Sequence, residues 1–147
     1  MTETANKLEQ LLKKGLEYLT QSSELELSRK ESVSKWSKKE ILGHLIDSGI
    51  NNLQRFTEIQ FENKPYPIRQ YNQNALVKAN DYQNADIKEI SEFWNSINLR
   101  ILYLIKKQTE KTLNYKVQLE KDKFCDLRFL MVDYVDHIEH HLKQIMK

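Results

Sequence analysis

The sequence predicts an all-α protein, in the form of a four-helix bundle. Four segments of about twenty residues repeat apolar side chains at spacings of three and four, the periodicity of one helix face. Glycine and proline are scarce, with 3 and 2 residues among 147, so the turn residues that a many-stranded sheet needs are largely missing. This length suits one domain with a single core, and we expect that domain to span residues 1–147.

The first two helices are expected over residues 3–21 and 38–62. The first has a stripe of leucines at helical spacing, namely Leu8, Leu11, Leu12, Leu16 and Leu19. The second begins after Ser37, because Ser37 and Glu40 have the spacing of a capping box. Trp36 precedes this cap and is expected to pack the start of the helix against the core.

A long connection, residues 63–85, follows the second helix. Pro65 and Pro67 exclude a regular helix at its start, and only a short helix around residues 74–78 is expected. A connection of this length in a small bundle often covers a functional site. We therefore expect it to line a pocket with Tyr66, Arg69 and Tyr71.

The last two helices are expected over residues 86–107 and 126–146. Asp86 is a suitable N-cap for the third helix, which has a broad apolar side. Residues 109–124 separate the two helices and are expected to be irregular. The stretch NYKVQLE is the best candidate for a strand within them.

The composition argues against several classes of protein. Lys and Arg total 23 against 21 acidic residues, and the basic runs are short, unlike the clustered basic face of a nucleic-acid binder. Cys125 is the only cysteine, so no intramolecular disulfide can form. The sequence shows no signal-peptide core and no apolar run of membrane-spanning length. We expect a cytoplasmic protein with no nucleic-acid partner and no membrane partner.

Three of the four histidines lie in the segment DYVDHIEHHLKQI. His137 and His141 are four residues apart, so they share one helix face at the edge of the apolar stripe, whereas His140 points further toward solvent. A pair at this spacing can present two imidazole nitrogens to one metal ion. His44, on the second helix, is the only other histidine that could supply a third ligand. Three imidazoles with open positions suit Zn²⁺, Ni²⁺ or Fe²⁺.

Other interpretations of these residues stand beside this one. Two histidines at helical spacing also occur by chance, as ordinary core or surface residues. The HExxH pattern of a metallopeptidase is absent, since Glu139 comes one place too late. Cys125 is more typical of a buried cysteine than of a nucleophile, because no histidine neighbours it in sequence.

Two segments taken together, WSKKEILGHLIDSGINNLQRF and DYVDHIEHHLKQI, resemble the DinB-like superfamily and within it the DinB_2 type. The resemblance covers most of the chain from Trp36 to Ile145. It implies a bundle of up-down-down-up topology, with a divalent metal held by His44, His137 and His141. Where relatives carry a YDQD-type segment followed by Trp, this chain reads YNQNAL, so substrate choice is expected to differ if that segment contacts substrate.

The resemblance leaves the function open between two classes. The superfamily includes thiol transferases and isomerases that use bacillithiol or mycothiol, and members without an assigned activity. This implies a metal-dependent transferase or hydrolase whose partner is a small molecule, for instance a low-molecular-weight thiol. The alternative is a non-catalytic, stress-related bundle with a structural or vestigial metal. Such a bundle is expected to be a homodimer. An open cleft over the histidines favours the first class.

Four further residues are candidates for supporting the metal ligands or for binding substrate. They are Asp47, Arg55, Tyr71 and Asp133. A carboxylate that accepts the second ring N–H of a ligand histidine would fix its tautomer, and Asp47 and Asp133 lie one turn from a histidine. Arg55 could orient an anionic group or form a structural ion pair. The same residues also fit an ordinary solvated helix face.

Overall fold

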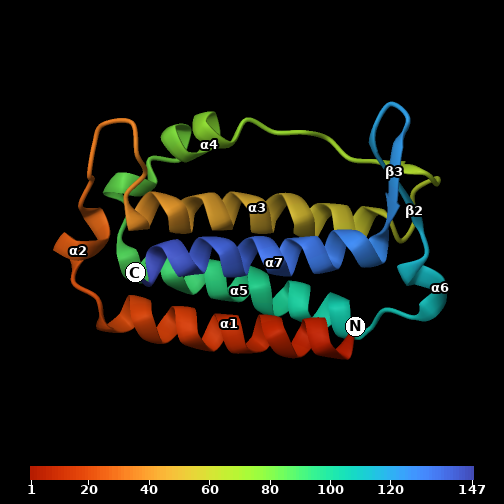
Figure 1. Ribbon diagram of the computed structural model, residues 1–147, viewed down its shortest axis with the longest axis horizontal. Helices are drawn as coiled ribbons and strands as arrows, with labels where there is room; N and C mark the ends of the chain where they lie inside the picture. The colour runs from red at the N-terminus through yellow and green to blue at the C-terminus, as the bar shows by residue number, and fades with distance from the viewer.

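Four long helices form the body of the molecule (Figure 1). The computed structural model describes residues 1–147. These helices are α1 (Thr2–Gln21), α3 (Lys38–Glu58), α5 (Ile87–Lys106) and α7 (Leu127–Ile145). The all-α bundle is therefore confirmed, and the helix ends agree with the expected ones except that α3 ends at Glu58 rather than near residue 62.

The order of the helices follows the up-down-down-up topology (Figure 1). Helices α1 and α7 run in one direction along the bundle, and α3 and α5 run in the other. Helix α3 packs against α5 and α7, and α1 packs against the same two. Helices α1 and α3 are therefore diagonal to each other although they are consecutive long helices.

Because α3 and α5 are parallel, the chain must return along the whole bundle between them. Residues 59–86 make this return and pass over α3 (Figure 1). The return includes helix α4 (Gln73–Ala79) and the 3-10 helix η1 (Tyr82–Asn84). The expected long connection with one short helix is confirmed, and α4 extends one residue beyond that expectation at each end.

The helix starts that the sequence indicated are present. Ser37 accepts the Glu40 backbone N–H, and the Glu40 carboxylate accepts the Ser37 N–H, which completes the capping box. Asp86 caps α5 by accepting the Glu89 N–H. The core between the four helices is apolar, with Trp94 and Phe56 among its fully buried side chains.

A small sheet closes one end of the bundle (Figure 1). Its strands are β1 (Tyr66–Pro67), β2 (Lys116–Glu120) and β3 (Lys123–Asp126), with β1 parallel and β3 antiparallel to β2. The expected strand at NYKVQLE is confirmed. No sequence pattern predicted β1, β3 or the short helices α2 (Glu24–Ser28) and α6 (Glu110–Leu113). Pairing of β1 with β2 joins distant segments, so no local pattern reveals it.

The four long helices are amphipathic, with apolar residues inward and charges outward. Surface ion pairs also join neighbouring helices, as where Lys7 of α1 contacts Asp136 and Glu139 of α7. No helix combines the length and the apolar character that crossing a membrane requires. A homodimer and a cytoplasmic location stay predictions.

Candidate metal centre

Three histidines converge between α3 and α7. His44, His137 and His141 each offer one ring nitrogen, and these nitrogens lie within 4.8 Å of one another. The Nε2 atoms of His44 and His137 are 3.1 Å apart. Two nitrogens bound to one cation at 2.0–2.1 Å would be about 2.9 to 3.4 Å apart in octahedral or tetrahedral geometry. The spacing of the imidazoles therefore fits a shared metal ion.

Two helices fix the positions of these rings. His44 lies in the second turn of α3, after the capping box, and only 1% of it is exposed. Helix α7 presents His137 and His141 one turn apart, with ring centroids separated by 4.5 Å. Helix packing thus assembles the cluster from segments that are 93 residues apart in the chain.

The imidazoles are neutral at neutral pH. Burial lowers the pKa of His44 to about 4, and the neighbouring His141 adds to the effect. Burial likewise lowers the pKa of His137 to about 4, with further contributions from the other histidines. The pKa of His141 is also lowered, mainly by burial. Neutral imidazoles keep a lone pair available, as a metal ligand must.

Two buried atoms in the cluster lack hydrogen-bond partners. They are the Nδ1 atoms of His44 and His137. Neither Asp47 nor Asp133 reaches them, so the structure does not bring these carboxylates to the ligands as the sequence analysis suggested. A cation on the two Nε2 atoms would leave the proton of each ring on Nδ1. The residues present fit a metal in this respect as well.

Gln144 orients the third imidazole, a role that the sequence analysis missed. Its Oε1 lies 2.9 Å from His141 Nδ1, so Nδ1 carries the proton and donates to it. That tautomer leaves Nε2 free to bind a cation. Gln144 follows His141 by three residues on α7, a spacing at which helix side chains meet, and this was the available signal.

Trp36 packs against one ring of the cluster, that of His44. Its ring centroid lies 5.0 Å from that of His44, with the two planes tilted by 33°. Trp36 also packs against the core, as expected from its place before the α3 cap. The indole therefore shields His44 from solvent, which the sequence had not indicated.

A cavity of about 830 Å³ lies near the cluster, although none of the three histidines lines it. Trp36 and Gln144 line it, and each of them contacts a histidine of the triad. Its rim is charged and includes Arg29, Lys38 and Glu26. The volume is in the range of small-molecule sites, which bury most of a ligand in a few hundred cubic ångströms.

Asp47 holds the return segment rather than a metal ligand. This carboxylate is buried, and its Oδ1 accepts hydrogen bonds from the Tyr82 hydroxyl at 2.6 Å and the Asn80 amide at 3.0 Å. Burial raises the pKa of Asp47, and the two hydrogen bonds oppose that effect. Gly43 permits this contact, because a Cβ there would overlap the Tyr82 ring. Asp133 is exposed on α7.

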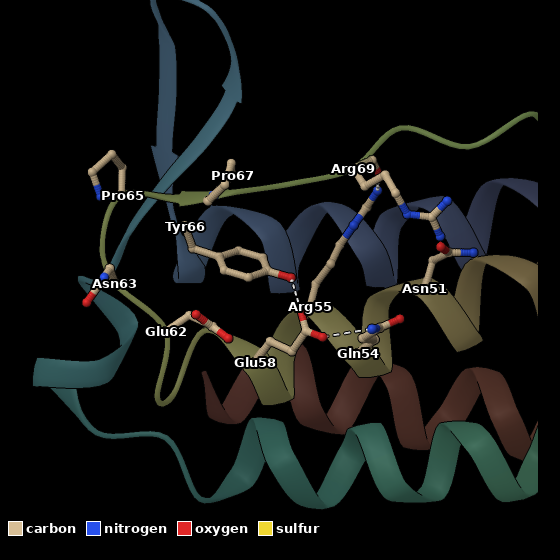
Figure 2. Close-up of a pocket in the computed structure, with 10 residues that line it drawn as sticks. All are labelled: Asn51, Gln54, Arg55, Glu58, Glu62, Asn63, Pro65, Tyr66, Pro67 and Arg69. Atoms are coloured by element: carbon tan, nitrogen blue, oxygen red, sulfur yellow. Dashed lines mark hydrogen bonds between the residues drawn. The ribbon is translucent and has the colours of Figure 1, made fainter.

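Arg55 and Tyr71 lie away from the histidines, at the other end of α3. Arg55 is eleven residues after His44, about 16 Å along the helix. It lines a separate cavity of about 450 Å³, to which Tyr66 and Arg69 also belong (Figure 2). Tyr71 stacks near Arg55, with the guanidinium 5.6 Å from the ring centroid. The expectation that Tyr66 and Arg69 line the pocket over the histidines is therefore wrong.

The two remaining candidates lie outside the triad. His140 is exposed on α7, and its ring centroid is 5.0 Å from that of His141. Cys125 is in β3, near the start of α7 and thus at the opposite end of that helix from His141. Burial raises the pKa of the Cys125 thiol, which opposes formation of a reactive thiolate.

Comparisons with known proteins find a matching family and a named relative. Residues 7–145 match the family described as the DinB superfamily. A protein of Halalkalibacterium halodurans named a putative metal-dependent hydrolase is 26% identical over 124 residues. That match covers 84% of this chain and 71% of the relative.

Solved structures share the fold. YfiT from Bacillus subtilis, described as a probable metal-dependent hydrolase with an unusual four-helix bundle topology, matches 99% of this chain and 85% of its own, with a TM-score of 0.80 and 22% identity. A mycothiol-dependent maleylpyruvate isomerase matches with a TM-score of 0.74 and 10% identity. This second match covers 98% of the present chain and 60% of the isomerase. At these identities the likeness is one of fold.

Proposed function

The chain belongs to the DinB superfamily, and on this premise we propose that it is a metal-dependent hydrolase of a small molecule. The ligands of the metal would be His44, His137 and His141. The observation that carries the proposal is the convergence of three neutral imidazoles, whose neighbours Trp36 and Gln144 line a cavity. The relative from Halalkalibacterium halodurans, named for metal-dependent hydrolysis, supports this choice of reaction. Zn²⁺, Ni²⁺ and Fe²⁺ all suit a three-imidazole site.

The contacts in the site indicate what each side chain would do. A divalent cation held by three imidazoles supplies Lewis acidity, which lowers the pKa of a coordinated water or thiol. Gln144 keeps the His141 ring in the tautomer that binds through Nε2. Trp36 packs against the buried His44 ring and also lines the cavity, so it would contact both a metal ligand and a small molecule bound there.

The cavity favours a polar substrate. Only 3 of its 13 lining residues are hydrophobic. Lys38 pairs with Glu26 and Lys35 pairs with Glu31, but Arg29 and Lys147 also line the cavity, so cationic side chains exceed acidic ones. A polar or anionic substrate is therefore favoured.

A second candidate reaction is transfer of a low-molecular-weight thiol. The observation that favours it is the shared fold of the mycothiol-dependent isomerase. The same three imidazoles and the same cavity would serve a thiol, since a coordinated thiol is deprotonated readily. A non-catalytic bundle is less well supported, because the open cavity near the triad leaves room for a substrate.

The first experiment is metal analysis of protein purified without a polyhistidine tag. The wild type is expected to retain one equivalent of Zn²⁺, Ni²⁺ or Fe²⁺ after incubation and desalting, and His44→Ala and His137→Ala to retain none. His140→Ala is the matched control, because it removes a histidine of the same helix turn outside the triad. Equal metal content in wild type and His137→Ala would overturn the assignment.

The second experiment separates the reactions. Metal-loaded protein is given a panel of small esters and amides, and in parallel a panel of thiols with an electrophilic acceptor. Turnover of an ester or amide that is lost in His137→Ala supports hydrolysis. Turnover only with a thiol supports the transferase alternative, and a metal-loaded protein that is inactive in both panels favours the non-catalytic bundle.

A further inference from the structure

The second cavity, about 450 Å³ in volume, lies at the far end of α3 from the histidines (Figure 2). Its floor is the last turns of α3, and its wall is the start of the return segment, residues 63–69. Only 1 of its 10 lining residues is hydrophobic. Its size is that of a small-molecule site, and its lining is that of a polar one.

Two arginines in this cavity have no carboxylate partner. Arg55 is half-buried, and its one hydrogen bond is to the Arg69 carbonyl oxygen, at 2.7 Å. Neither Arg55 nor Arg69 forms an ion pair. Burial and the nearby Arg69 both lower the pKa of Arg55. A half-buried guanidinium beside a second cation is costly unless an anion accompanies it.

The carboxylate of Glu58, which also lines this cavity, is already engaged by other donors. Glu58 accepts hydrogen bonds from the Tyr66 hydroxyl at 2.7 Å and from the Gln54 amide at 2.7 Å (Figure 2). It therefore faces neutral donors, although Arg55 lies on the same helix three residues earlier. Apart from the N–H that donates to the Arg69 carbonyl oxygen, the guanidinium N–H groups of Arg55 remain available to an external anion.

The opposite side of the cavity carries negative charge. Glu62 is exposed and lines the cavity, and its carboxylate makes no hydrogen bond or ion pair within the chain. Figure 2 shows Arg55 and Arg69 toward one side and Glu62 toward the other. With Glu58 and Glu62 in the lining, a doubly charged phosphate would meet repulsion. A ligand with one negative and one positive group would meet a partner at each side.

We propose that this cavity is a second ligand site, which binds a small zwitterion of the amino-acid type. Arg55 and Arg69 hold its carboxylate, and Glu62 faces its ammonium group. The site stands apart from the metal centre, because Arg55 is about 16 Å along α3 from His44. It does not depend on the proposed hydrolase activity.

The test uses matched probes followed by amide chemical shifts of the full-length, metal-loaded protein. L-alanine is the zwitterion, propionate lacks its amine, ethylamine lacks its carboxylate, and inorganic phosphate tests a doubly charged anion. L-alanine is expected to shift amides of residues 51–69 with millimolar affinity and propionate to bind several-fold more weakly. Ethylamine is expected to leave these amides unchanged.

Variants decide which groups hold the probe. Arg55→Gln and Arg69→Gln are each expected to weaken L-alanine binding at least about tenfold. Arg69 is exposed, so Arg69→Gln keeps the fold even if Arg55→Gln loosens the return segment. Amino acids can also chelate metals, and His137→Ala is the control: binding near Arg55 is expected to persist in it.

Three outcomes would overturn the proposal. One is the absence of L-alanine-induced shifts around residues 51–69. Another is an L-alanine affinity that Arg69→Gln leaves unchanged. The third is tighter binding of phosphate than of L-alanine, which would make the site one for phosphate rather than for a zwitterion.

Discussion

Ionisable side chains are withdrawn from water at both ends of α3, but they favour ligands of opposite charge. At one end are the imidazoles of His44 and, from α7, His137, which burial keeps neutral, so they are able to bind a cation. At the other end the group is the half-buried guanidinium of Arg55, which stays charged and therefore favours an anion. One helix can therefore border a site that favours cations and a site that favours anions, because the charge of the buried side chain differs between its two ends.

Removing one imidazole should have the largest effect, and that effect should be confined to the histidine end of α3. His137→Ala leaves two ligands, and we expect metal affinity to fall about a thousandfold, roughly 4 kcal/mol. Calorimetric titration with Zn²⁺ measures the change. His140→Ala should keep the wild-type affinity, and an equal loss in that variant would show that the ligand set has been assigned wrongly.

Lowering the pH should destabilise the histidine end of the metal-free protein. The pKa values of His44 and His137 are about 4 in the folded state, against about 6.5 in an unfolded chain. The unfolded chain therefore binds protons between pH 6.5 and 4 that the folded chain does not, so stability is full above pH 6.5 and falls as the pH drops. At pH 5 the loss is about 2 kcal/mol for each imidazole.

Chemical denaturation of the metal-free protein at pH 7 and pH 5 tests this dependence. The window lies above the range in which the carboxylates with lowered pKa values, such as Glu24 and Glu139, take up protons. The doubly substituted His44→Gln, His137→Gln protein is the control and should show a flatter response. A wild type that is equally stable at both values would contradict the burial of neutral imidazoles.

Filling the space at Gly43 should loosen the histidine end and leave the arginine end intact. The new methyl group of Gly43→Ala would overlap the Tyr82 ring and push η1 away from Asp47. We expect a loss of about 2 kcal/mol in unfolding free energy, typical of overpacking a tight contact. Thermal unfolding measures it. Gly49 is less suitable for this purpose, because its neighbours are in the core rather than in the return segment.

Removing the side chain that orients His141 should have the smallest effect. Gln144→Ala takes away the acceptor at His141 Nδ1, and we expect metal affinity to fall about tenfold, the usual order for such a partner. Gln144→Glu keeps an acceptor at the same place and should restore most of the affinity. If both variants bind metal as the wild type does, Gln144 lines the cavity without orienting the ring.

Much of this arrangement could be predicted because it rests on local patterns. The leucine stripe of α1 and the capping box at Ser37 fixed two helices, and the spacing of His137 and His141 placed both on one face of α7. The convergence of these two with His44 followed from the family resemblance and from His44 being the only other histidine. The geometry of the cluster agrees with that expectation.

The rest depends on contacts between distant segments. Trp36 lies on His44 because of the path of the loop before α3, and no periodicity encodes that path. Pairing of Tyr66 with Val117 directs the return segment toward the far end of α3. Tyr66 and Arg69 therefore line the second cavity and not the one beside the histidines.

The separation of 93 positions between His44 and His137 has a consequence for how the protein unfolds. A cation held by both would close a large loop of the chain, as a cross-link does, and would restrict the unfolded ensemble in the same way. With Cys125 as its only cysteine, the chain cannot form an internal covalent link. A metal ion would act as a removable staple between the second and last long helices, and the concentration of free metal would set how firmly that staple holds.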